Sequence, residues 1–358
     1  MKNTIKRVYI YGTGDIAKKL VRKYNDSDFQ IVGILDRVRI YGRFEGVKIV
    51  EWRDISEGDA DGVIIAAPNS VRKEIYMRIL PYCMARDLII LDASERLLEE
   101  DFGENVFIEK KSEYARTKEE LLNQVNHYDV ISFDIFDTLL MRKVLEPLDV
   151  FSYVEDRMSE KDSRYKDFRK YRRTAEISCI DGNIYEIYRK IIELMDLSEE
   201  ESQLLLDEEI KSEKELLVVR RDVLDVLNYA LKIGKKVIAV SDMYLPQNIM
   251  TGILEEKGII GFDDVFVSCD FKKSKNNGLF EKVRDGYSNK ILHIGDDYFA
   301  DIVSPNRYGI DSMGVYKSSD LLRMSDKAKK IGYIMNLDES LKTGEELSVY
   351  YNSPFEGL

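Results

Sequence analysis

The chain has 358 residues, of which 44% are hydrophobic, and its formal net charge at pH 7 is -12. This length exceeds the usual size of one domain, so we expect two or more domains with buried cores of their own. The acidic balance argues against a general nucleic-acid binder or a membrane-surface binder, although a local basic site could still receive an anionic substrate.

Cysteine usage and the absence of long apolar stretches bear on the compartment. Cys83, Cys179 and Cys269 are isolated and have no paired metal-ligand spacing, which favours free thiols in a reducing environment. No stretch resembles a signal peptide or a membrane span. We therefore expect a cytoplasmic protein that does not insert into membranes.

The first hundred residues alternate between short apolar runs and helical patterns, which predicts a parallel α/β sheet. We expect strands at Arg7–Tyr11, Phe29–Leu35, Val47–Val50, Gly62–Ala67 and Leu88–Leu91. Residues 1–105 are assigned to this first domain. Residues 106–128 are charged and weakly helical and are assigned to a connector helix.

A glycine-rich turn follows the first predicted strand. The sequence GTGDIA begins at Gly12 and includes Gly14 and Ala17, and Asp36 follows the second strand. This is the dinucleotide-binding fingerprint in its GxGxxA form, in which the glycines allow close approach of a phosphate to the helix amides. Asp15 argues against a ligand, because a carboxylate at the helix start would cap those amides and repel pyrophosphate. A bound nucleotide, nucleotide-sugar or NAD and an empty scaffold for assembly all stay open.

A second α/β unit is predicted to begin at Asp129, with its first strand at Val130–Phe133. A long helical stretch, Leu148 to Tyr229, follows, and an insertion at this place is typical of a cap over the mouth of the sheet. Further strands are expected at Lys236–Val240, Asp264–Ser268, Lys290–Ile294 and Ser312–Tyr316. We assign residues 129–140 and 230–320 to a catalytic core, 141–229 to a helical cap and 321–358 to a C-terminal helix and tail.

Polar residues lie at the ends of several of these predicted strands, where an open parallel sheet binds its ligands. Asp134 follows the first strand of the second unit, Ser241 follows the next, and Asp296, Asp297 and Asp301 follow a later one. A carboxylate at a strand end can attack phosphorus, and a hard cation with oxygen ligands would neutralise the charge that develops. Lys275 could neutralise the transferring group. The residues therefore suit metal-assisted attack on a phosphate ester.

In their order and placement these four elements resemble the motifs of the haloacid-dehalogenase-like (HAD) superfamily. The resemblance covers about Asp129 to Tyr316. It implies that Asp134 is the nucleophile and that Mg²⁺ is held by Asp134, the backbone carbonyl of Phe136 and Asp296. It also implies that Ser241 and Lys275 hold the phosphoryl group. Two further acids, Asp297 and Asp301, would support the metal directly or through water and would orient Lys275, and Thr138 would fix the loop.

One position departs from the phosphatases of that superfamily. They carry a second aspartate two residues after the nucleophile as a general acid and base, and this chain has Phe136 there. General acid–base help is typically worth about 10²–10⁴-fold in rate. Asp137 is adjacent but is expected to point to the other side of an extended segment. Three outcomes follow: a modified phosphatase or phosphotransferase, a metal-free dehalogenase, or a site kept for binding alone.

Longer stretches of sequence narrow the resemblance. Ser132 to Leu140 with Arg142, Ser241 to Pro246, and Lys275 with Gly278, Leu279 and Phe280 are similar to predicted hydrolases associated with surface-polysaccharide biosynthesis. The first unit resembles the Rossmann domains attached to sugar-modifying enzymes of glycan pathways, on Gly12, Gly14, Ala17, Asp36, Gly42, Gly46 and Ala66 to Asn69. In the predicted cap, Arg142 and Arg172 are candidates to bind an anionic substrate. The alternative for Arg172 is one residue of a solvated helix face.

The sequence thus predicts a Rossmann-like sheet followed by a HAD-type sheet with a helical cap. The leading function is Mg²⁺-dependent phosphoryl transfer or hydrolysis on a small phosphorylated metabolite, such as a sugar phosphate, through an aspartyl-phosphate. The first alternative is a catalytically degenerate binding or regulatory protein, and the second is a haloacid-type dehalogenase. A homo-oligomer and a glycan-pathway enzyme stay open as protein partners, and nucleic acid is not expected.

Overall fold

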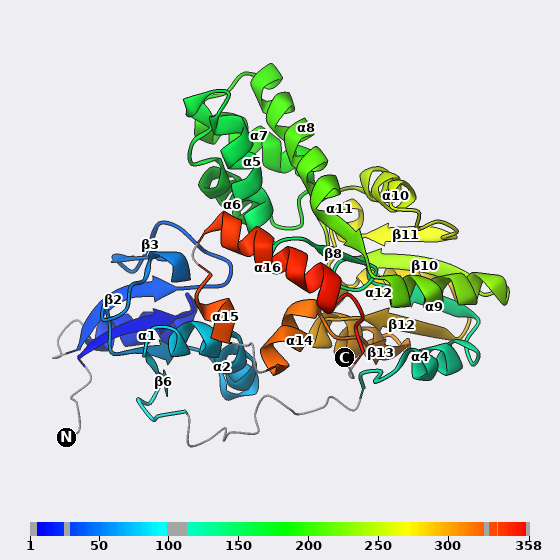
Figure 1. The fold of residues 1–358 in the computed structure, drawn as a ribbon, viewed down its shortest axis with the longest axis horizontal. Coiled ribbons are helices and arrows are strands. Elements are labelled where there is room, and N and C mark those ends of the chain that lie inside the picture. The colour runs from blue at the N-terminus through cyan, green and yellow to red at the C-terminus, as the bar shows by residue number, and fades with distance from the viewer. Residues whose placement is uncertain (1–5, 25–28, 99–112, 326–328, 335, 356–358) are drawn as a thin grey trace. The chain divides into compact units, whose positions relative to one another are not determined.

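The computed structural model describes residues 6–24, 29–98, 113–325, 329–334 and 336–355 (Figure 1). The chain divides into two compact units, Met1–Glu109 with Leu322–Glu339, and Lys110–Leu321 with Ser340–Leu358. It passes from the second unit to the first within α14 (Ser318–Met324) and returns within α16 (Leu337–Tyr350). The segment predicted as a tail is therefore shared between the units. The predicted domain end at residue 105 and the first part of the predicted connector, 106–112, lie outside the described residues.

The first unit contains a four-stranded parallel sheet of order β2-β1-β5-β6. Alternate residues of the central strand face opposite sides: Val8 and Ile10 pack with α1, whereas Tyr9 and Tyr11 pack on the side of α2. Burial on both faces is what a parallel sheet requires. The elements are β1 (Arg7–Tyr11), α1 (Asp15–Tyr24), β2 (Gln30–Leu35), an antiparallel pair β3 (Arg43–Phe44) and β4 (Val47–Lys48), η1 (Trp52–Asp54), β5 (Gly62–Ile65), α2 (Asn69–Met84), β6 (Ile89–Asp92) and α15 (Lys329–Gly332).

The second unit contains a five-stranded parallel sheet of order β11-β10-β7-β12-β13. Its strands are β7 (Val130–Phe133), β10 (Lys236–Ser241), β11 (Asp264–Val267), β12 (Ile291–Gly295) and β13 (Asp311–Gly314). The first strand in sequence, β7, lies in the middle, and every one of its residues is buried. The chain builds the sheet outward from β7 in one direction and then returns to build it in the other, so the strand order reverses between β7 and β12.

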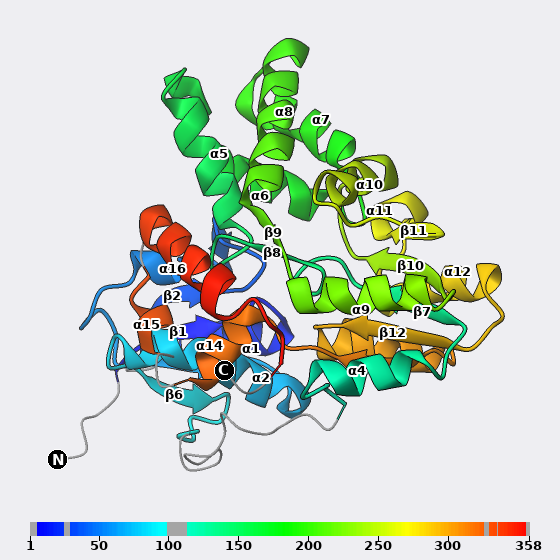
Figure 2. The same ribbon diagram turned by 45° about the vertical axis from the view of Figure 1, so that its right-hand side comes forward.

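Helices flank this sheet and also form an insertion after β7. Around the sheet lie α4 (Lys118–Val125), α9 (Arg221–Lys232), α10 (Gln247–Glu256), α11 (Ser268–Phe271), η4 (Lys275–Asn277), α12 (Leu279–Gly286), the π-helical turn η5 (Tyr298–Val303) and α13 (Ser304–Arg307). The insertion contains α5 (Asp149–Ser159), η3 (Ser163–Tyr165), α6 (Phe168–Ser178), α7 (Ile184–Met195) and α8 (Glu199–Leu216). In both views it projects beyond the β8–β9 pair (Figures 1 and 2).

A two-stranded antiparallel ribbon connects the insertion to the sheet. Its strands are β8 (Leu140–Arg142) and β9 (Leu217–Val219). The helical stretch expected from Leu148 to Tyr229 is therefore interrupted by β9. The helix after the ribbon, α9, packs against α4 and β10 rather than within the insertion.

The prediction of an α/β fold with two parallel sheets is confirmed. The apolar runs located the strands because continuous apolar burial distinguishes them from the amphipathic helices around them. The run expected as a strand at Val47–Val50 forms β4, which pairs antiparallel with β3 and does not join the parallel sheet. The bounds of the other strands differ from the expected ones by a few residues. Among the described residues, no helix is long and apolar enough to cross a membrane.

Candidate active site

The candidate site lies where the strand order of the second sheet reverses. Phe133, the last residue of β7, is in register with Ala239 of β10 on one side and Ile294 of β12 on the other. Asp134 follows directly, and its amide donates a hydrogen bond to the Ile294 carbonyl at 2.8 Å. Because the loops after β7 and β12 leave the sheet at this point, their side chains meet at the place where open α/β sheets bind ligands.

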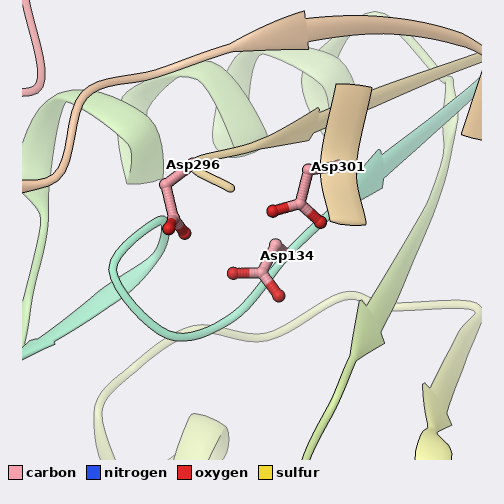
Figure 3. Close-up of side chains that lie close together, drawn as sticks. All are labelled: Asp134, Asp296 and Asp301. Carbon is pink, nitrogen blue, oxygen red and sulfur yellow. The ribbon is translucent and has the colours of Figure 1, made fainter. Parts of the chain in front are cut away.

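Three carboxylates converge there. Asp134, Asp296 and Asp301 each offer an oxygen within 4.8 Å of the others, and all three residues are buried. Figure 3 shows their carboxyl groups facing a common space, one from the loop after β7 and two from the segment after β12. The sequence placed these residues at strand ends, and the fold brings them together.

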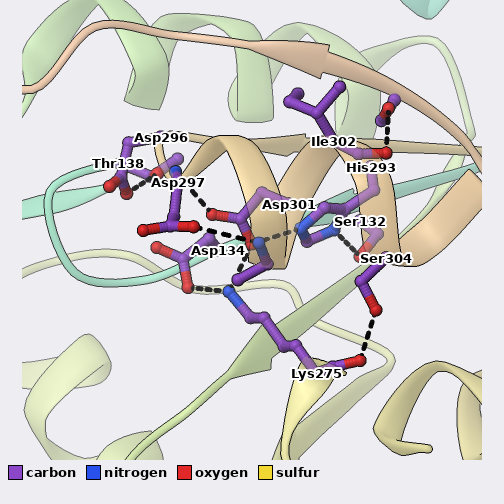
Figure 4. A network of polar contacts seen from close by, with 12 residues as sticks. Ser132, Asp134, Thr138, Lys275, His293, Asp296, Asp297, Asp301, Ile302 and Ser304 are labelled. Atoms are coloured by element: carbon purple, nitrogen blue, oxygen red, sulfur yellow. Dashed lines mark hydrogen bonds and ion pairs between the residues drawn. The ribbon is translucent and has the colours of Figure 1, made fainter. Parts of the chain in front are cut away.

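Lys275 lies between two of these acids (Figure 4). Its ammonium donates to Asp134 and, at 2.6 Å, to Oδ1 of Asp301. The backbone of Lys275 is fixed on both sides, because its amide donates to Asp242 at 2.7 Å and its carbonyl accepts from the Ser304 hydroxyl. Held in this way, a side chain that is only 2% exposed can reach both carboxylates.

Asp301 is held by three donors. Lys275 and His293 bind Oδ1, the latter through Nε2 at 3.0 Å, and the Asp297 amide binds Oδ2 at 2.9 Å. Burial would raise the pKa of Asp301, but the charge of Lys275 and the hydrogen bond with His293 outweigh it and hold this pKa well below the ordinary value.

The tautomer of His293 follows from its two partners. Burial lowers the pKa of His293, so the ring is neutral at physiological pH. An ionised Asp301 can only accept, so Nε2 carries the proton. Nδ1 then accepts from the Ser132 hydroxyl at 2.7 Å. Sequence analysis did not assign this role to His293.

Asp296 is engaged at both oxygens and at its backbone. Oδ1 accepts from the Thr138 hydroxyl at 2.9 Å, Oδ2 lies 2.7 Å from the Lys317 ammonium, and the carbonyl accepts from the Tyr114 hydroxyl at 2.6 Å. Sequence reasoning missed Lys317 and Tyr114. The available signal for Lys317 was its place directly after the last expected strand, at the same edge of the sheet as the acids.

Asp297 has a different role from its neighbour. Its Oδ1 accepts from the amides of Phe299 and Ala300, both at 3.0 Å, and so caps the start of η5. Its side chain is 40% exposed and lies 4.0 Å from Lys317. The cap positions η5, which in turn carries Asp301.

The donor set suits a small, hard cation. Burial raises the pKa of Asp134 well above its ordinary value, and it also raises the pKa of Asp296, in both cases against the opposing effect of a nearby lysine. Mg²⁺ takes oxygen ligands at about 2.0–2.1 Å in an octahedron, so opposite ligands lie roughly 4 Å apart. Carboxylate oxygens within 4.8 Å of one another can meet that requirement with little movement.

Ser241 and Phe136 complete the predicted set. Ser241 is the buried last residue of β10, the strand beside β7. Phe136 lies in a tight loop that turns at Asp137, whose φ is +58°, and the Asp137 carbonyl accepts from buried Arg220. The Phe136 ring is half-buried, and the Arg142 guanidinium lies 4.2 Å from its centroid.

The two arginines predicted to bind substrate are both paired with acids of the insertion. Arg142 binds Glu213 at 2.7 Å. Arg172 is fully buried and binds Glu209 through two nitrogens, at 2.7 and 2.8 Å. It is therefore not on a solvated helix face, and it bonds to none of the acids of the three-carboxylate cluster. A substrate anion would have to displace Glu209 to reach it.

In the first unit, the glycine-rich turn directly follows β1. The strand order of that sheet reverses between β1 and its neighbour β5, so the turn lies at the switch point. Gly12 has a φ of +115°, and a Cβ there would lie 3.3 Å from the Ala66 carbonyl oxygen. Gly14 directly precedes α1, and Ala17 is a buried residue of that helix. Asp36 accepts from the Thr13 hydroxyl at 2.9 Å and from the amides at 38 and 39. These contacts give the fingerprint residues roles in the turn itself, and ligand binding there stays a prediction.

Comparisons with known proteins give partial matches. A family model described as C2185-like, N-terminal, matches residues 4–90. No curated protein is similar enough to match. Among solved structures, the HAD-hydrolase YfnB from Bacillus subtilis bound to magnesium is 17% identical, covers 55% of this chain and 98% of its own, and has a TM-score of 0.38.

Two further structures show a similar level of likeness. A haloacid dehalogenase-like family hydrolase from Xanthomonas campestris is 14% identical, covers 61% of this chain and 91% of its own, and has a TM-score of 0.38. A HAD phosphatase from Thermococcus onnurineus is 23% identical, covers 51% of this chain and 84% of its own, and has a TM-score of 0.34. Scores of this size do not establish a shared function, so a functional assignment depends on the side chains of this chain.

Proposed function

We propose that the second unit is a Mg²⁺-dependent phosphatase or phosphotransferase of the HAD type that acts on a small phosphorylated metabolite. The observation that supports this most directly is the convergence of Asp134, Asp296 and Asp301 around Lys275 at the switch point of the sheet. A carboxylate nucleophile, a lysine and further oxygen ligands are the parts that phosphoryl transfer through an aspartyl-phosphate requires.

In this proposal Asp134 attacks phosphorus, the P–O bond to the substrate alcohol breaks as that alcohol leaves, and an aspartyl-phosphate forms. Attack of water or another acceptor on phosphorus then breaks the bond to Asp134 and restores the carboxylate. Lys275 would neutralise charge on the phosphoryl oxygens, and the Ser241 hydroxyl would donate a hydrogen bond that orients them. Mg²⁺, when bound through Asp134, the backbone carbonyl of Phe136 and Asp296, supplies charge neutralisation for the nucleophile and the phosphoryl group. Asp301 holds the Lys275 ammonium in place, and Asp297 fixes the turn that carries Asp301.

Phe136 bears on both halves of the reaction. Without a carboxyl group at that position, protonation of the leaving group and activation of water lose help worth about 10²–10⁴-fold. A substrate with a good leaving group, or an acceptor other than water, would be affected least. This is why the proposal includes a phosphotransferase.

The helical insertion is proposed to act as a cap that selects the substrate and excludes water. A sugar phosphate or another compound of a nucleotide-sugar pathway is the proposed substrate class, from the likeness to hydrolases of surface-polysaccharide biosynthesis. A nucleotide, nucleotide-sugar or NAD in the first unit remains a prediction from the glycine-rich turn.

The test is the Asp134→Asn variant of the full chain, assayed with Mg²⁺ over a broad panel of phosphate esters. Turnover should fall to background in this variant, and acid quenching of the unchanged protein should trap phosphate on Asp134. Asp285→Asn, an exposed acid on α12, is the matched control and should retain full activity. Undiminished turnover in Asp134→Asn would refute the mechanism.

The alternative of a binding or regulatory protein predicts a different result. The unchanged protein would then release no phosphate from any ester, and a nucleotide would raise its melting temperature without any effect of Mg²⁺ or phosphate. Halide release in the absence of a metal would instead favour the dehalogenase.

A further inference from the structure

Lys317 lies in the candidate site, but the proposed mechanism gives this residue no role. Its ammonium lies 2.7 Å from Oδ2 of Asp296 and 4.0 Å from Oδ2 of Asp297. The lysine side chain is 25% exposed, whereas that of Asp296 is 4% exposed. A positive charge thus lies directly on one of the carboxylates expected to bind the metal.

The backbone on both sides of this contact is fixed. The carbonyl of Tyr316, the residue before Lys317, accepts from buried Arg220 at 2.8 Å. Tyr114 packs its ring at 4.9 Å from that of Tyr316 and donates its hydroxyl to the Asp296 carbonyl. Tyr114 therefore connects the chain that carries Lys317 to the chain that carries Asp296. The ammonium is held near this carboxylate rather than reaching it by chance from a mobile loop.

The two lysines are divided unevenly among the three carboxylates. Lys275 serves both Asp134 and Asp301, whereas Lys317 is the lysine bound to Asp296. Three buried carboxylates without these two lysines would repel one another strongly, because like charges at short distance in a poorly solvated site are costly. With both lysines in place, two positive charges offset most of the charge of the three carboxylates, and one negative charge is left over before any metal binds.

The same arrangement opposes metal binding. A divalent cation that binds Asp296 meets a fixed positive charge within a few ångströms, on an oxygen that the ammonium already uses. It must displace the ammonium or bind beside it, and either costs binding free energy. The Thr138 hydroxyl on the other oxygen is neutral and imposes no such cost.

We propose that Lys317 is a positioning residue that takes the place of the metal on Asp296 when no metal is bound and weakens Mg²⁺ binding by competing for that carboxylate. The inference rests on the proposed Mg²⁺-dependent function, because it requires Asp296 to be a metal ligand. Its consequence is that Lys317 sets the Mg²⁺ concentration at which the site fills.

The test measures Mg²⁺ binding to the full chain by calorimetry, with MgCl₂ alone as the ligand. Lys317→Met and Lys317→Gln remove the charge, and each should bind Mg²⁺ about tenfold more tightly or better, the size expected when one nearby charge in a partly buried site is removed. Lys317→Arg keeps the charge and should stay within about threefold of the unchanged protein. Lys282→Met, at a position of α12 where the lysine side chain is 37% exposed, is the control and should change nothing.

A second measurement covers the case in which the neutral variants are unstable. Removing Lys317 leaves Asp296 buried without its cation, so these variants should melt at a lower temperature in EDTA. Mg²⁺ should then raise their melting temperature more than it raises that of the unchanged protein, because binding to the folded state alone is stabilising. A variant that folds only with Mg²⁺ would support the inference in the same way.

The outcomes separate this inference from the function on which it rests. If the unchanged protein binds Mg²⁺ and Asp296→Asn does not, Asp296 is a ligand. Equal or weaker Mg²⁺ binding by both neutral Lys317 variants would then overturn the inference alone. If the unchanged protein binds no Mg²⁺ at all, the proposed function fails and the inference fails with it.

Discussion

Replacing His293 with leucine tests whether the buried chain of hydrogen bonds behind the candidate nucleophile is structurally important. The ring is fully buried, and an apolar neighbour, Phe280, packs edge-on at 4.9 Å. A leucine of similar size should therefore fit. It would, however, remove the acceptor of the Ser132 hydroxyl and one donor to Asp301.

The two lost bonds set the expected magnitude. A neutral hydrogen bond contributes about 1 kcal/mol and a bond to a charged group about 1.5–3 kcal/mol, and the groups left behind are buried. We therefore expect β12 to be destabilised by roughly 2–4 kcal/mol. Lys275 and the Asp297 amide still hold Asp301, which is why the loss should not be larger.

Hydrogen–deuterium exchange of the peptide that spans Ile291–Gly295 measures this directly, since its amides report the opening of β12. Exchange should accelerate about 30-fold to several hundred-fold, at 1.4 kcal/mol for each factor of ten. Ser132→Ala in the His293→Leu background should recover about 1 kcal/mol by removing the unpaired hydroxyl. Exchange within threefold of the unchanged protein would refute the hydrogen-bond assignment and with it the tautomer of His293.

Two further predictions concern stability. Gly344 lies inside α16, where an added Cβ would lie 2.2 Å from the carbonyl carbon of Lys143, so Gly344→Ala should cost about 1–3 kcal/mol or more in urea unfolding. Gly252→Ala in α10 meets no atom within 4 Å and should stabilise by about 0.5–1 kcal/mol; equal effects would contradict the close contact. In the first unit, the amides of Arg7 and Lys6 donate hydrogen bonds to Asp61, and these bonds lower its pKa. The ionised carboxylate therefore stabilises the fold at pH values above the ordinary aspartate pKa. This stabilisation is lost as the pH falls through the lowered pKa of Asp61. Asp61→Asn should therefore melt lower than the unchanged protein at pH 7, and the gap should narrow as the pH falls below the ordinary aspartate pKa; a gap that does not change with pH would exclude this origin.

The sequence located much of the second unit because its signals are local. Apolar runs predicted the strands, and a polar residue directly after each run predicted the edge at which Asp134, Ser241 and the acids after β12 lie. That these side chains lie close together followed from a general rule, because the carboxyl ends of parallel strands share one edge of the sheet. No side-chain contact had to be known for that inference.

What the sequence could not supply were contacts between distant segments. No motif in the local sequence distinguishes Lys317 or Tyr114. Only the fold places the Lys317 ammonium beside the Asp296 carboxylate and the Tyr114 hydroxyl at the Asp296 backbone carbonyl. The burial of Arg172 could not be predicted for the same reason. Its basic neighbours suggest an exposed face, yet its guanidinium is buried and bound to Glu209, 4.3 Å from the Phe151 ring centroid and 4.5 Å from that of Tyr244.

Phe136 shows how a departure from a motif can fit its surroundings. The Arg142 guanidinium covers its ring and is itself bound to Glu213 from the insertion, with only 13% of the arginine side chain exposed. A cation over an aromatic face in a desolvated place contributes about 2 kcal/mol. A carboxyl group at position 136 would instead lie under that guanidinium, which would lower its pKa and keep it ionised. It would then be a poor proton donor. The stack connects the loop of the candidate nucleophile to the helical insertion, and this connection is incompatible with a general acid at the same position.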